Sequence, residues 1–394
     1  MTKVTYVVIF TTILIISTAN AQTGIHRVLA DVERNNKSLA SGKQYREAQN
    51  ILYKIGLNPE NPKIEYDYLP GRPEGAGTQE DFSVTQGFDF PTSYAKRRSV
   101  ANEQIVKAEL EFQAERQRIL LETKLVCIDL IYRKKLESEL SKRMKNANTL
   151  LEAITRQTQQ GESSILDLNK VKLLQLEIKN QADLNVTTLT TLQQKLDELN
   201  GGIPLDLSAL DYPLLQAIAP FETLDSLIEA NDPEVKVISQ QKEISQEQVA
   251  LSRSITLPKF EGGFHQQSIL GQKYQGFHVG MTIPLWENKN RVKSENARLL
   301  FSEFQIAEHR TMHHYKNKQL YEQYLHWQNT FAEYRQILGS ANNEELLNKA
   351  LSAGQVSLIE YLMEVRYFYD AIVRSLEAEK ALHDLAAQLY KFQL

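Results

Sequence analysis

The sequence contains an internal repeat, and this duplication constrains the possible folds more than any other feature. Four pairs of segments match in register: 35–36 with 231–232, 62–65 with 258–261, 88–91 with 281–284, and 161–167 with 354–360. The offset changes from 196 to 193 residues between the second and third pairs, inside a predicted loop, where changes of length are tolerated. The chain is therefore predicted to consist of two copies of one unit.

Each copy contains two short stretches with the alternation of β-strands. Phe82, Val84 and Phe88 alternate with small and polar residues, and Phe277 and Val279 do the same in the second copy. A period of two places apolar side chains on one face and polar side chains on the other. We predict β-hairpins at residues 62–91 and 258–284. The predicted polar face carries Glu65, Asp67, Asp89, Glu261, His265 and His278.

A very long helical hairpin is predicted after each β-hairpin. Almost no helix breaker occurs between Pro91 and Gly161, or between Pro284 and Gly339, and apolar residues recur in steps of three and four. Seventy helical residues span roughly 105 Å, far more than a globular core needs. Shorter helices are predicted on both sides of these elements, at residues 25–55 and 163–199 in the first copy and at 224–256 and 355–392 in the second.

Residues 1–21 have the features of a secretory signal peptide. Lys3 precedes an apolar run at residues 7–16, and Ala19 and Ala21 precede a predicted cleavage site at Gln22. The apolar run is about half of the ~20 residues that a spanning helix needs. The predicted organisation is a signal peptide at 1–21, a first repeat at 22–200, a connector rich in glycine and proline at 201–222, and a second repeat at 223–394.

The composition excludes several classes of function. The net charge of −4 makes nucleic acid an unsuitable partner. The one cysteine, Cys127, lies in an apolar stripe, so no intrachain disulfide is available and a buried thiol is expected. We find no nucleophile beside a base, no phosphate-binding glycine loop and no metal-ligand cluster, so we predict neither an enzyme nor a cofactor.

Four amphipathic strands cannot close into a barrel, and open strand edges are not tolerated in lipid. The smallest outer-membrane barrels have about 8 strands, so two to four chains would be needed to build one. Three chains would supply twelve strands. The polar strand faces would then line a lumen, and the apolar faces would contact lipid.

The order and spacing of these features resemble the TolC family of outer membrane efflux proteins. The resemblance rests on the signal peptide, the duplicated hairpins that end in Pro91 and Pro284, the long helices and the Gly-x-x-Ser turns at Gly161 and Gly354, and it covers essentially the whole mature chain. It implies a mainly α fold with a small β part, assembled as a homotrimer. The trimer would form a twelve-stranded β-barrel in the outer membrane of a Gram-negative bacterium and an α-barrel tunnel through the periplasm.

The resemblance also implies a function and partners. The chain would be the passive exit duct of a tripartite efflux system for small toxic compounds or metal cations. A periplasmic adaptor would dock at the helix tips, formed here by Gly161, Ser164, Gly354 and Ser357, and an inner-membrane transporter would supply the energy. Two alternatives remain: a duct for type I protein secretion, and a periplasmic coiled-coil scaffold that transports nothing.

The family closes its tunnel with acidic residues just after the turn glycine. Six positions after each glycine stand Asp167 and Glu360, which would form rings of carboxylates in a narrow pore. The family's second acid, nine positions after the glycine, is replaced by Met363, although Glu364 is adjacent. The alternative is that Asp167 and Glu360 only stabilise helix N-termini, where a negative charge offsets the helix dipole.

Three histidines stand close together at His309, His313 and His314. An i, i+4 pair on a helix can hold a metal ion. The only carboxylate near them in the sequence is Glu308, and Arg310, Lys316 and Lys318 add positive charge. The pattern therefore favours a solvated or interhelical face over a metal site.

Overall fold

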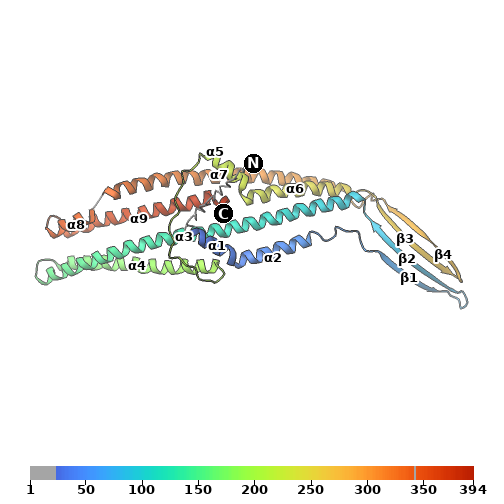
Figure 1. Cartoon of the computed structure of the whole chain (residues 1–394), viewed down its shortest axis with the longest axis horizontal. Coiled ribbons are helices and arrows are strands. Elements are labelled where there is room, and N and C mark those ends of the chain that lie inside the picture. Colours follow the sequence, from blue (N-terminus) through green and yellow to red (C-terminus); the bar gives the residue numbers. More distant parts are fainter. Residues whose placement is uncertain (1–23, 341–342) are drawn as a thin grey trace, which may run out of the picture.

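The computed structural model describes residues 24–340 and 343–394, so the predicted signal peptide lies outside the described residues. The described chain is a long bundle of helices with a β-sheet at one end (Figure 1). The helices are α1 (Gly24–Asn35), α2 (Lys37–Leu52), α3 (Pro91–Gln159), α4 (Ile165–Leu199), α5 (Phe221–Asn231), α6 (Pro233–Ser254), α7 (Arg291–Ser340), α8 (Asn343–Ser352) and α9 (Leu358–Leu389), followed by a 3-10 turn, η1 (Lys391–Gln393). The strands are β1 (Lys63–Pro70), β2 (Thr78–Phe88), β3 (Lys259–Ile269) and β4 (Gln272–Thr282).

The element order repeats in the two halves of the chain: two short helices, a β-hairpin, a long helix and a return helix. The mainly helical fold with four strands confirms the predicted fold class. The second long helix starts later than predicted, at Arg291 and not near Pro284. The physical reason is a turn, in which the Lys289 N–H donates to the Trp286 oxygen at 3.1 Å and Asn290 adopts a positive φ of 65°.

The prediction of one continuous helix before each β-hairpin is wrong. The first is interrupted at Asn36 and the second at Asp232, which occupy equivalent positions in the repeat. Each residue has an extended backbone and caps the next helix, since Asn36 accepts from the Leu39 N–H at 2.9 Å and Asp232 from the Glu234 N–H at 3.0 Å. Pro233 reinforces the second break, because the residue before a proline avoids helical geometry.

Both capping residues are also fixed to the end of the return helix in their own half. Asn36 Nδ2 donates to the Leu199 oxygen at 2.7 Å, and Asp232 Oδ2 lies 2.9 Å from Lys391 Nζ. Asn36 and Asp232 are buried. The breaks therefore serve as joints that connect the middle of the bundle to the C-terminal end of α4 and to η1.

The four strands form one antiparallel sheet in the order β1-β2-β3-β4. The pairing of β2 with β3, in which Ser83 lies opposite His265, joins the two halves of the chain into one sheet. Within the described residues, β1 and β4 are the outer strands and each has a partner on one side only.

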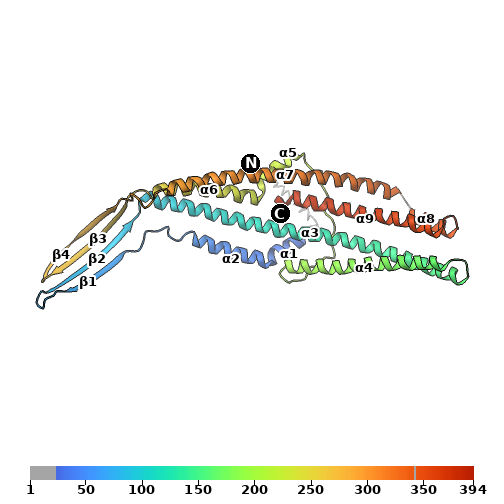
Figure 2. The same cartoon turned by 180° about the vertical axis from the view of Figure 1, so that it is seen from behind.

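Four helices lie side by side next to the sheet and form a layer in the order α2, α3, α6 and α7 (Figures 1 and 2). A central core cluster gathers residues of α1, α3 and α4, among them Val32, Cys127, Ile128 and Leu196. Cys127 is fully buried as predicted, and burial raises the pKa of its thiol to about 12. No helix in the described ranges combines the length and the apolarity needed to cross a membrane.

The connector between the two halves is held against the bundle by Tyr212. Its ring stacks on His383 of α9 with 4.2 Å between the centroids, and Lys135 Nζ, from α3, lies 4.4 Å from the Tyr212 ring centroid. Burial, followed by the nearby charge of Lys135, lowers the pKa of His383 to about 4. His383 is therefore neutral in the folded protein near neutral pH.

This burial predicts a stability that depends on pH. The pKa of His383 is near 6.5 in the unfolded chain and about 4 in the folded protein. Between these two pH values the unfolded chain carries a proton on His383 and the folded protein does not, so the proton favours unfolding. The free energy of unfolding should thus fall by about 3 kcal/mol from this residue between about pH 6.5 and pH 4, and remain constant above that range. Denaturant unfolding of wild type and His383→Phe, which keeps the stack but cannot titrate, measures the contribution. Equal pH slopes for the two proteins would contradict it.

Candidate functional site

The end of the rod opposite the sheet carries two helical turns, one from α3 to α4 and one from α8 to α9 (Figure 1). Gly161 and Gly354 have positive φ angles of 78° and 66°. At each turn the N–H of the residue after the glycine bonds a carbonyl oxygen five residues back, at 2.8 Å for Glu162 and 2.9 Å for Gln355. These are Schellman turns, in which glycine ends a helix without steric strain.

The return helices begin with caps that explain the serines and acids of both turn motifs. The Oγ atoms of Ser164 and Ser357 accept from the backbone N–H groups of Asp167 and Glu360, at 3.1 and 3.3 Å. Glu360 Oε2 accepts in turn from the Ser357 N–H at 2.8 Å, which completes a capping box. The structure therefore shows both acids stabilising helix N-termini.

Both carboxylates keep their charge at neutral pH. Hydrogen bonds from Ser164 and Lys170 lower the pKa of Asp167, and hydrogen bonds from the backbone and side chain of Ser357 lower the pKa of Glu360. Glu364 is exposed one turn further along α9, beside Met363. Each helical turn thus carries fixed negative charge at its end.

The sheet brings together five of the six residues predicted for its polar face: Glu65, Asp67, Glu261, His265 and His278. All five are exposed, and His278 Nε2 lies 3.5 Å from Glu261 Oε1. Asp89 differs from the prediction, because it lies beyond the end of β2. Its carboxylate pairs with Arg97 and its N–H donates to the Tyr94 hydroxyl at 2.9 Å, so it fixes the start of α3.

The other face of the sheet is apolar and exposed. Phe277 and Val279 of β4 are 92% and 84% exposed, and Ile64 and Tyr66 of β1 are also exposed. Exposed apolar surface of this extent on a single chain indicates a contact with lipid or with protein.

We compared the sequence and the structure with known proteins. No protein-family model and no curated protein matches the sequence. Among solved structures, the chain is similar to the outer-membrane channel OprN, with 11% identity, a TM-score of 0.78, and coverage of 94% of this chain and 89% of that one. The chain has a TolC-like fold.

Two further structures support this assignment of the fold. A membrane protein from Pseudomonas aeruginosa is 15% identical, with a TM-score of 0.77 over 94% of this chain and 93% of that one. The Campylobacter jejuni CmeC outer membrane channel is 14% identical, with a TM-score of 0.71 over 94% and 85%. The resemblance inferred from the repeat is therefore confirmed at the level of the TolC-like fold.

The three histidines lie within the TolC-like fold where α7 meets the joint between α5 and α6. His314 Nδ1 lies 2.6 Å from Asp225 Oδ2, and His313 Nε2 lies 3.5 Å from Asp232 Oδ2. Glu308 is therefore not the nearest carboxylate, because α5 and its cap supply two others that the sequence order could not reveal. Across residues 24–340 and 343–394, no three His, Cys, Asp or Glu side chains are placed to hold a metal ion. The interhelical interpretation of these histidines is the one that the structure supports.

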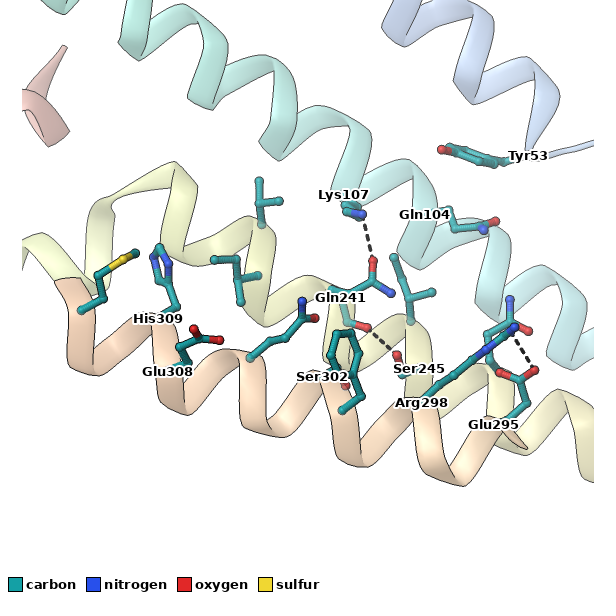
Figure 3. A pocket seen from close by; sticks show the side chains of 17 residues that line it. Tyr53, Gln104, Lys107, Gln241, Ser245, Glu295, Arg298, Ser302, Glu308 and His309 are labelled. Carbon is teal, nitrogen blue, oxygen red and sulfur yellow. Dashed lines mark hydrogen bonds and ion pairs between the residues drawn. The ribbon is translucent and has the colours of Figure 1, made fainter. Parts of the chain in front are cut away.

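A cavity of about 940 Å³ lies between α3, α6 and α7, and Figure 3 shows its polar lining. Lys107 Nζ donates to Gln241 Oε1 at 2.8 Å across it, and Arg298 Nη1 lies 3.1 Å from Glu295 Oε1. Phe301 also lines the cavity and is 62% exposed. The lining thus mixes polar groups with apolar side chains such as Phe301, and one face of the helical layer of the TolC-like fold is hollowed at this point.

Proposed function

We propose that this protein is the outer-membrane exit duct of a tripartite efflux system, a passive conduit for small toxic compounds or metal cations expelled by an inner-membrane pump. The observation that carries the proposal is the TolC-like fold over 94% of the chain, shared with structures described as outer-membrane channels. The sheet and the helix tips, at opposite ends of the rod, supply a membrane end and a docking end for that role.

The functional unit is a homotrimer. The sheet of one chain has two outer strands, β1 and β4, whose free edges would be open in a single copy. Pairing of β4 with β1 of the next copy satisfies both edges, and three copies give a closed barrel of twelve strands. In this arrangement Phe277 and Val279 face lipid, while Glu261, His265 and His278 line the lumen.

The helix tips face the periplasm and bind the adaptor around Gly161, Ser164, Gly354 and Ser357. Exposed apolar residues next to these turns, Ile165 at 59% and Leu166 at 66%, provide a contact surface. Three copies of Asp167 and Glu360 form acidic rings at the aperture, which favour cations. The inner-membrane transporter supplies the energy.

The non-transporting scaffold fits the structure less well. A soluble periplasmic scaffold has no use for a sheet face on which Phe277 is 92% exposed, since such a surface promotes aggregation. A duct for type I protein secretion would use the same fold and remains the alternative. It differs from the proposal in what is exported, a protein in place of small compounds or metal cations.

Fractionation of cells that express the full chain tests the proposal. We expect the mature protein in the outer membrane as a trimer that dissociates in detergent only on heating. A soluble monomer in the periplasmic fraction would refute the duct and favour the scaffold.

A further inference from the structure

The seam between α3 and α6 joins the two halves of one chain, and polar side chains connect it. The contacts are Lys96 Nζ to Glu247 Oε2 at 3.1 Å, Lys107 Nζ to Gln241 Oε1 at 2.8 Å, and Gln240 Nε2 to both the backbone oxygen of Glu103, at 3.2 Å, and its carboxylate. This seam pairs the long helix of the first half with the short helix of the second half. The repeat implies a second seam of the same kind, between the long helix of the second half and a short helix of the first half.

Within one chain that second seam cannot form. The helices concerned are α7 and α2, which lie at opposite edges of the layer with α3 and α6 between them in both views (Figures 1 and 2). One side of α3 packs against α6, and the corresponding side of α7 has no helix against it within the described part of the chain. Likewise, one side of α6 packs against α3, and the corresponding side of α2 has none of the described helices against it.

The residues at these equivalent positions are suited to each other. Applying the two offsets of the repeat, Lys107 and Gln241 correspond to Leu300 and Tyr45, and Glu103 and Gln240 correspond to Asn296 and Gln44. In the first pair both members change, from lysine and glutamine to leucine and tyrosine, whereas in the second pair only the glutamate changes, to asparagine, and the glutamine is kept. The Lys96 contact has no counterpart, because its equivalent, Lys289, precedes the start of α7.

In the single chain, apolar side chains on these free sides of α7 and α2 are exposed to solvent. On α7, Leu300 is 53% exposed and Phe304, one turn later on the same side, is 67% exposed. On α2, Tyr45 is 65% exposed and Ile51 is 60% exposed, with Ile55 at 71% just beyond the helix. Two apolar stripes thus occur on the two edges that the repeat leaves without a partner.

We infer that the stripe Tyr45–Ile51–Ile55 of one copy packs against the stripe Leu300–Phe304 of a second copy, forming an apolar seam that differs from the polar seam inside the chain. The two stripes are different surfaces, so the contact is head-to-tail and repeats around a ring. The inference rests on the oligomer of the proposed function and assigns the helical part of its subunit contact. The seam follows the same direction around the ring as the pairing of β4 with β1.

Cysteine cross-linking tests the seam in the full-length mature protein extracted from membranes. Tyr45→Cys and Leu300→Cys are introduced together and treated with a short thiol cross-linker. Cys127 does not interfere, because it is fully buried and has a raised thiol pKa. We expect covalent dimers and trimers from the double variant and none from either single variant. Lys107→Cys with Gln241→Cys is the matched control, which should cross-link only within the chain.

The outcomes separate this inference from the proposed function. If sedimentation shows a trimer but the double variant yields only monomer after cross-linking, the seam is wrong and the duct survives. If the protein sediments as a monomer, the duct fails as well. A second pair of variants uses neighbours on α7: Phe304→Glu should lower the temperature at which the trimer dissociates, whereas Phe301→Glu, on the cavity side, should leave it nearly unchanged. Equal effects of the two variants would also overturn the seam.

Discussion

Replacing Asp232 with alanine is expected to lower the free energy of unfolding by about 2–4 kcal/mol, from the lost helix cap and the lost charged hydrogen bonds. The carboxylate is fully buried, caps α6 through the Glu234 N–H, and lies 2.9 Å from Lys391 Nζ and 3.5 Å from His313 Nε2. Burial alone raises the pKa of Asp232, but hydrogen bonding to His313 and the ion pair with Lys391 lower it to about 2, so it is charged under all ordinary conditions. Alanine removes the cap and leaves a partly buried lysine with one fewer counter-charge.

Asp232→Asn is the matched control for this variant. Asparagine keeps an oxygen for the Glu234 N–H and occupies the equivalent joint of the first repeat, where Asn36 caps α2. The free energy of unfolding of Asp232→Asn should therefore lie between the values for wild type and Asp232→Ala. Denaturant unfolding monitored by circular dichroism measures all three. A loss below about 1 kcal/mol for Asp232→Ala, the size of a simple cap, would show that the ion pair contributes nothing.

Neutralising the helix tips by Asp167→Asn with Glu360→Gln is expected to abolish the cation preference that we propose for the duct. A ring of carboxylates in a narrow pore attracts cations and repels anions, and both groups are charged because hydrogen bonds lower their pKa values. The amides keep the oxygen atoms that accept from Ser164 and Ser357, so the caps survive while the charge is lost. The reversal potential across a planar bilayer with a salt gradient measures the change.

Glu152→Gln is the control for a general loss of negative charge, because Glu152 lies on α3 before the turn, 3.8 Å from Arg156, and is 72% exposed at its side chain. Adding Glu364→Gln to the tip variant shows whether this acid, beside Met363, takes the place of the missing second ring. An unchanged reversal potential in the Asp167 and Glu360 variant would leave these residues with their capping role alone.

The repeat and the periodicities could be predicted from the sequence because they reflect local chemistry. Glycine at Gly161 and Gly354 is needed for a positive φ, and the alternation of apolar residues from Phe82 to Phe88 follows from the pleat of a strand. The return helices were predicted to start at residues 163 and 355, and they begin at Ile165 and Leu358, within three residues of the prediction.

The breaks at Asn36 and Asp232 were missed although the matching pair was visible. Asparagine and aspartate occur both inside helices and as caps, and the choice here depends on a buried partner from the far end of the return helix, Leu199 or Lys391. A proline directly after Asp232 was the local signal that could have revealed the second break.

The residues that surround the candidate sites could not be predicted from the sequence, because they come from segments far apart in the chain. Asp225 reaches His314 across 89 positions of sequence, and no periodicity within α7 reveals that contact. Asp89 had the correct alternation for the polar face of the sheet, but the strand ends one residue earlier and Arg97 of the next helix holds its carboxylate. Pairing of β2 with β3 likewise joins segments that lie about 180 residues apart.

Cryo-electron microscopy of the detergent-extracted mature protein tests the central claim most directly. We expect a particle with threefold symmetry, in which twelve strands close a barrel and the long helices form a tunnel with Asp167 and Glu360 at its far end. A monomer, or an assembly in which the edges of β1 and β4 remain open, would contradict it.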